Sequence, residues 1–116
     1  MRELPAPVHR VRTRVRRVSC SGELFADVTL DFGPGDGFEN EVPADLLPAP
    51  WAERLAEGVR EGLDGVRARV TLRSAHHRPY AHPERSLGTA GYQAAREALA
   101  RAGLIGPGEP RTSGGD

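Results

Sequence analysis

Three segments of the chain alternate apolar and charged residues, and this alternation limits the possible folds more than any other feature of the sequence. Successive side chains of a strand point to opposite faces of its sheet, so the pattern predicts strands with one covered and one solvated face. The segments are 8–18, 23–32 and 66–73. A shorter alternating segment, 38–42, stops at Pro43. The sequence therefore predicts four strands of one sheet.

The first two strands are close enough in sequence to form a hairpin, with turn residues at 19–22. The alternation of the first strand loses its phase between Val15 and Val18, which suggests a bulge or the end of that strand. The outer side of this strand carries arginines, and the outer side of the second carries Asp27 and Asp31. Cross-strand pairs between them would each contribute about 0.2–1 kcal/mol.

Two further segments, 50–63 and 83–102, have the spacing of helices with one apolar side. Each begins with a proline, which suits the first helical turn because its missing N–H has no intrahelical partner there. Gly58 and Gly62 lie inside the first helix, where each costs about 1 kcal/mol relative to alanine. A close approach of the sheet to this helix would explain both glycines.

The order strand, strand, strand, helix, strand, helix predicts an α+β fold: a two-layer sandwich with a four-stranded sheet and two helices on one face. The opposite face would be open and rich in arginine. A chain of 116 residues supports one domain with one core. We expect this domain at 8–105, after an N-terminal lead-in at 1–7 and before a disordered, glycine- and proline-rich tail at 106–116.

The net charge is zero, but the charges are unevenly distributed along the chain. Residues 1–22 contain six arginines and one acid, residues 23–64 eleven acids and two arginines, and residues 65–105 seven arginines and two acids. A neutral chain of this kind can still present a basic surface to an anionic partner. The single cysteine, Cys20, fits a reducing compartment, and no stretch resembles a signal peptide or a membrane span. We therefore expect a cytoplasmic protein.

Three of the four histidines lie in the segment 74–82, SAHHRPYAH. A metal site would need all three to converge, but neighbours such as His76 and His77 point to opposite sides of an extended chain. A nucleophilic site would pair Cys20 or Ser21 with a histidine base, and nothing in the sequence indicates an activated thiol or an orienting acid. We expect no metal, no cofactor and no catalytic residues.

Contact with RNA fits the chemistry of this segment better. Guanidinium groups bind phosphates with paired hydrogen bonds, and Tyr80 or the imidazoles could stack on an unpaired base. The plain alternative is a solvated polar loop beside a solvated arginine face. The predicted RNA-binding residues lie in or beside two expected loops, 19–23 and 74–86. They are Ser21, Gly22, Arg73, His76, His77, Arg78, Tyr80, His82 and Arg85.

The ordered series of segments resembles domain IV of elongation factor G and of the related ribosomal-protection proteins of tetracycline resistance. The strand 37–42, GFENEV, and the helix 51–63, WAERLAEGVREGL, are similar to a strand and the following helix of that family. The strand 66–72 resembles the next one, and residues 87–104 match the last helix in position and in small residues. The resemblance covers residues 8–104.

This resemblance implies a fold like the second domain of a small-subunit ribosomal protein, with a left-handed strand–helix–strand crossover. In the family, the loop between the first two strands and the loop after the last strand form a tip that enters the decoding region of the ribosome. The chain has no phosphate-binding GxxxxGK[ST] motif, so it is not expected to hydrolyse GTP. The family signature of the first loop is reduced to Ser21-Gly22-Glu23.

The resemblance therefore implies a stand-alone, non-catalytic module that binds ribosomal RNA or the ribosome through its two tip loops. The alternative is a protein–protein adaptor or structural module that uses the open sheet face. Neither hypothesis involves a membrane or a small-molecule substrate.

Overall fold

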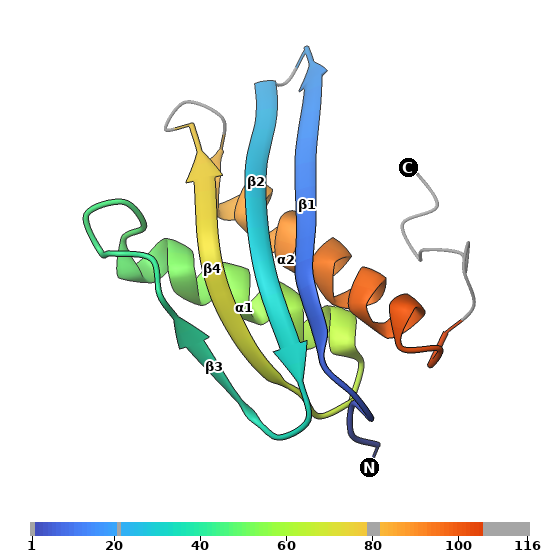
Figure 1. Ribbon diagram of the computed structural model, residues 1–116. Coiled ribbons are helices and arrows are strands. Elements are labelled where there is room, and N and C mark those ends of the chain that lie inside the picture. Colours follow the sequence, from blue (N-terminus) through green and yellow to red (C-terminus); the bar gives the residue numbers. More distant parts are fainter. Residues whose placement is uncertain (1, 21, 79–81, 106–116) are drawn as a thin grey trace.

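The computed structural model describes residues 2–20, 22–78 and 82–105 and shows two layers, with both helices behind the sheet in Figure 1. The predicted α+β two-layer sandwich and the predicted order of elements are confirmed. The elements are β1 (Val8–Ser19), β2 (Gly22–Gly33), β3 (Gly37–Asn40), α1 (Ala49–Leu63), β4 (Arg69–His77) and α2 (Pro83–Arg101).

The four strands form one mixed sheet in the order β1-β2-β4-β3. β2 is antiparallel to both β1 and β4, and β3 is parallel to β4. α1 connects these two parallel strands. In Figure 1 both point the same way, β4 lies to the right of β3, and α1 passes behind the sheet, so the crossover is left-handed. Crossovers of this type are right-handed in nearly all proteins, so this connection is an exception, and the resemblance implied it.

The covered face of the sheet and the facing sides of the two helices form one core. On β2 every second residue from Leu24 to Phe32 is buried, as the alternation predicted. The residues between them, apart from Asp27, are partly exposed on the open face. The largest fully buried apolar side chains are Phe32, Leu4, Leu30, Leu47, Leu55, Leu72, Leu87 and Leu99.

The irregularity of β1 lies at the other end from the one predicted. β1 pairs regularly with β2 from Val11 to Ser19, and the register shifts between Val8 and Val11. Arg10, inside this shift, has a φ of 56°, which is uncommon for a residue with a side chain. Of the two alternatives predicted near Val18, the bulge was wrong and the strand end was right, since β1 ends at Ser19. Val18 is an apolar residue on the open face, 73% exposed, in regular register with Glu23.

β4 is longer than predicted, because a bulge changes the phase of its alternation. The register against β2 shifts by one residue between Leu72 and Ser74, so Arg73 is the extra residue of the bulge. Beyond it the strand continues to His77. The alternation of apolar and polar residues breaks at the bulge, although the strand continues. For this reason the sequence analysis ended the strand at residue 73 and assigned residues 74–77 to a loop.

The predicted lead-in at 1–7 contributes to the core. Leu4 is completely buried, and its N–H donates to the carbonyl of Arg67 at 2.8 Å. The N–H of Arg67 donates in turn to the carbonyl of Arg2 at 2.8 Å. The predicted tail at 106–116 lies outside the described residues. Neither helix of the described chain is long and apolar enough to cross a bilayer.

The glycines of α1 face α2, and the expectation that they face the sheet was wrong. A Cβ built on Gly58 would overlap the carbonyl of Gly88, and one built on Gly62 would lie 2.5 Å from the carbonyl oxygen of Tyr92. From the other side, a Cβ on Gly91 would lie 2.5 Å from the carbonyl oxygen of Leu55. Both helices therefore use glycine to bring their backbones into contact.

Candidate nucleic-acid interface

The turn between β1 and β2 and the junction between β4 and α2 lie at the same end of the sheet, at the top of Figure 1. We call this end the tip and define it by the described residues of 16–25 and 76–86. The antiparallel register requires this arrangement, because β2 begins where both β1 and β4 end. The structure thus brings together two segments about 55 residues apart in sequence, as shown by the ion pair between Glu23 and Arg78 (|i−j| = 55).

Two contacts join the hairpin to the start of α2. The His82 imidazole lies against Gly22, where a Cβ would come within 2.6 Å of His82 Nε2. The N–H of Phe25 donates to Ser86 Oγ at 3.1 Å, and Ser86 is completely buried. Gly22 has a φ of 133°, which suits glycine and few other residues. The positive φ therefore favours glycine at position 22, and a Cβ there would also displace the His82 ring.

The expected tip loop at 74–86 is mostly regular structure, and this corrects the prediction. Residues 74–77 are the end of β4, and residues 83–86 are the first turn of α2. In the expected loop at 19–23, residues 22–23 belong to β2. Of the predicted RNA-binding residues, Ser21 and Tyr80 lie outside the described residues.

The three clustered histidines point in different directions. His76 lies on the open face opposite Asp27, and His77 faces the helices. The His77 ring contacts Trp51 edge to face, with centroids 4.8 Å apart, and its Nε2 lies 3.1 Å from the Leu46 carbonyl oxygen. His77 therefore holds the segment before α1 and does not face outward with the rest of the predicted site. Within residues 2–20, 22–78 and 82–105 no three histidine, cysteine or acidic side chains are arranged to hold a metal ion.

Arg78 is the predicted residue with the most defined position at the tip. Its Cζ lies 4.2 Å from the centroid of the Phe25 ring, and its Nη1 donates to Glu23 Oε2 at 2.9 Å. Phe25 and Glu23 were not among the predicted RNA-binding residues, although Glu23 lies in the expected loop 19–23. Their outward positions on β2 were predictable from the alternation, but their contact with Arg78 depends on the length of β4.

Three further arginines of the tip are exposed. Arg16 lies directly opposite Phe25 on the open face, Arg17 lies opposite Leu24 and so on the other face of the sheet, and Arg85 lies in the first turn of α2. None of these three makes an ion pair with an acid among the described residues. Arg16 and Arg17 were not among the predicted RNA-binding residues. The tip therefore keeps positive charge that nearby carboxylates do not neutralise.

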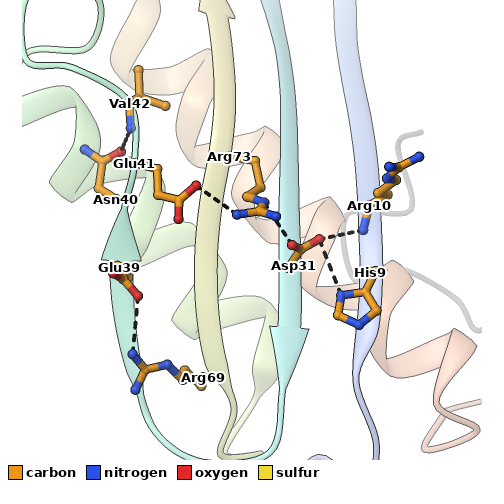
Figure 2. Close-up of polar contacts among 9 residues, drawn as sticks. All are labelled: His9, Arg10, Asp31, Glu39, Asn40, Glu41, Val42, Arg69 and Arg73. Carbon is orange, nitrogen blue, oxygen red and sulfur yellow. Dashed lines mark hydrogen bonds and ion pairs between the residues drawn. The ribbon is translucent and has the colours of Figure 1, made fainter.

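Arg73 is not at the tip, and this corrects its assignment to the site. From its bulge it reaches two carboxylates in the middle of the open face, as Figure 2 shows. Its Nε lies 3.0 Å from Asp31 Oδ2 and its Nη1 lies 2.9 Å from Glu41 Oε1. Asp31 also accepts the N–H of Arg10 at 2.7 Å. Two of the arginines that line the shallow hollow of about 710 Å³ around Asp31, Arg12 and Arg73, thus already form ion pairs with acids.

Asp27 pairs with the arginines of β1, which confirms the predicted cross-strand pairing. Arg12 donates to both of its oxygens, at 3.0 and 2.7 Å, and Arg14 lies 3.5 Å away. The hydrogen bond from Arg12 holds the pKa of the Asp27 carboxyl below its ordinary value, although burial acts in the opposite direction. The charges of Arg12, Arg14 and His76 lower this pKa further. The middle of the open face is therefore internally neutralised, in contrast to the tip.

No protein-family model matches the sequence. No curated protein matches it either. Among solved structures 50 chains match, and one of them is a protein from Thermus thermophilus whose name states no function. The match to this protein has a TM-score of 0.77 at 15% sequence identity and covers 86% of the present chain but only 16% of the Thermus chain. At this identity the likeness shows the fold alone. The chain therefore shares its fold with a small part of a much longer Thermus thermophilus protein.

Proposed function

We propose that the protein is a non-catalytic, cytoplasmic RNA-binding module, related to domain IV of elongation factor G, that contacts ribosomal RNA with its tip. One observation carries the proposal: Arg16, Arg17 and Arg85 are exposed at the tip, and none of them forms an ion pair with an acid among the described residues. Guanidinium groups bind phosphate oxygens in a bidentate manner, and unneutralised positive charge attracts a polyanion. The resemblance of the sequence to domain IV supplies ribosomal RNA as the expected ligand.

The adaptor hypothesis has less support from the open face. The cores of protein–protein interfaces are depleted of charged residues. Most of the open face carries arginines and acids that pair with one another, such as Arg69 with Glu39 at 3.3 Å and Arg73 with Glu41 at 2.9 Å (Figure 2). A protein partner would have to break or cover these pairs. We therefore propose that the partner binds at the tip, and the RNA-binding experiment below is designed to exclude the adaptor hypothesis.

The test is a filter-binding titration of a ribosomal RNA fragment at several salt concentrations, with wild type and the triple variant Arg16→Ala, Arg78→Ala, Arg85→Ala. Each arginine that neutralises a phosphate contributes about 0.7–0.9 to the slope of log K against log salt. We expect the triple variant to lower this slope by about 2 and to weaken binding at least about tenfold at low salt.

The matched control is the triple variant Arg67→Ala, Arg69→Ala, Arg101→Ala, which removes the same charge from exposed ion pairs away from the tip. We expect it to bind RNA nearly as wild type does, because these arginines already face acids. Equal weakening by both triple variants would mean that net charge, and not the tip, determines binding. No salt-dependent binding by the wild type would reject RNA as the ligand and favour the adaptor.

A further inference from the structure

Arg78 and Phe25 form a stacked pair on the open face of the tip. The distance of 4.2 Å from Arg78 Cζ to the ring centroid is within the range of about 6 Å for a cation–π contact. Glu23 accepts a hydrogen bond from Nη1 at 2.9 Å, so the guanidinium is held on one side by a ring and at one edge by a carboxylate. Its side chain remains 40% exposed. A flat, cationic surface is thus held in a fixed orientation before any ligand arrives.

The neighbours across the hairpin extend this surface. Arg16 lies opposite Phe25, and Val18 lies opposite Glu23. Val18 is 73% exposed, although the rest of the open face of β1 is mostly arginine. Val18 and Arg16 of β1 therefore lie beside Glu23 and Phe25 of β2, and the guanidinium of Arg78, which follows β4, lies over the Phe25 ring. An unpaired nucleotide has a flat, apolar base face and a phosphate. The Arg78 guanidinium and Val18 suit the base face, and Arg16 suits the phosphate.

We infer that the Arg78–Phe25 pair is a stacking platform for one unpaired base of single-stranded RNA, with Val18 at its edge and Arg16 on the adjoining phosphate. This inference rests on the proposed function and narrows its ligand. A base inside a duplex has both of its faces covered by neighbouring bases, so the platform selects single strands, loops or ends. Arginine suits this position better than lysine, because only a planar guanidinium stacks on a ring and on a base at once.

The experiment uses a short single-stranded RNA that carries 2-aminopurine at one position, and the same RNA annealed to its complement. Stacking quenches 2-aminopurine fluorescence, so the wild type is expected to quench the single strand on binding. Arg78→Lys keeps the charge but loses the plane, and Phe25→Leu keeps an apolar side chain but loses the ring. Loss of one base stack corresponds to a loss of about five- to 150-fold in affinity for the single strand.

The salt dependence separates stacking from charge. Arg78→Lys is expected to weaken single-strand binding without changing the salt slope, because the number of cations is unchanged. Arg16→Lys is the matched control, because lysine also binds a phosphate as a point charge, and it is expected to keep both affinity and quenching. Phe25→Leu provides a second variant, and thermal melts of all three show whether the fold is retained.

The outcomes distinguish the two proposals. Salt-dependent RNA binding with equal affinity for single strand and duplex, or quenching unchanged in both Arg78→Lys and Phe25→Leu, overturns the platform and leaves RNA binding by the tip in place. Absence of binding to either RNA overturns both. Single-strand preference that is lost in both variants and kept in Arg16→Lys supports the platform.

Discussion

Alanine at Gly58 or at Gly91 is expected to destabilise the protein by about 2 kcal/mol. The new Cβ would overlap the carbonyl of Gly88 in the first case and would lie 2.5 Å from the carbonyl oxygen of Leu55 in the second. Both obstacles are backbone atoms of the facing helix, so α1 and α2 would have to move apart. Overpacking of a core costs about 1–3 kcal/mol and occasionally more, and the gain in helix propensity of about 1 kcal/mol offsets it only partly.

Gly88→Ala is the matched control for this prediction. Gly88 lies on the same helix as Gly91, but its Cβ would meet only the flexible side chain of Arg54, with Nε at 3.3 Å. We expect this variant to be as stable as the wild type or more stable by up to about 1 kcal/mol. Urea unfolding followed by the fluorescence of Trp51, the single tryptophan, measures all three variants. Similar stabilities for the three would contradict the close helix contact.

Replacement of Asp27 by alanine is expected to lower the free energy of unfolding by about 1–3 kcal/mol at neutral pH, the usual range for a lost hydrogen-bonded charge of this kind. The side chain is nearly buried and accepts two hydrogen bonds from Arg12, at 3.0 and 2.7 Å. Its loss also leaves Arg12 and Arg14 close together on the open face without their shared carboxylate. Asp45→Ala is the control, because Asp45 is exposed and surface substitutions usually change stability by less than about 0.5 kcal/mol.

The lowered pKa of Asp27 also predicts how the stability of the protein changes with pH. The pKa of Asp27 is lower in the folded chain than the ordinary value of 3.8, so the unfolded chain binds a proton at higher pH than the folded one does. The stability that Asp27 contributes is therefore fully present above the ordinary value and is lost as the pH falls through the lowered pKa. Urea unfolding of wild type and Asp27→Ala from neutral to strongly acidic pH should show the difference between them shrink in this window. A constant difference would mean that the ionised carboxylate is not what stabilises the fold.

The position of most candidate site residues was predicted from the sequence, and the position of Arg73 was not. Gly22, His76, Arg78, His82 and Arg85 lie at the tip, where the sequence analysis placed them. Arg73 does not, because the bulge that contains it directs its side chain to Asp31 and Glu41. A bulge changes the phase of a strand by a single residue, and its position depends on the partner strand, which a local pattern does not contain.

The close packing of α1 against α2 could not be predicted from the sequence either. Gly58 and Gly62 are visible in the sequence as unfavourable helix residues, but the surface that they contact is set by the way α1 lies against α2. Leu4 gave no periodic signal, because a single apolar residue in a proline-bearing segment has no pattern, and its burial depends on the contact between the N-terminus and Arg67.

The sequence by itself determined the number and order of the strands and helices, the faces of β2 and the start of α2 at Pro83, because alternation and proline chemistry act between neighbouring residues. The tertiary structure alone decided that Arg78 lies over Phe25, that Arg12 and Arg73 pair with acids in the middle of the open face while Arg16 at the tip does not, and that glycines join the two helices. These contacts connect residues that are distant in the chain, and the register of the sheet and the packing of the helices bring them together.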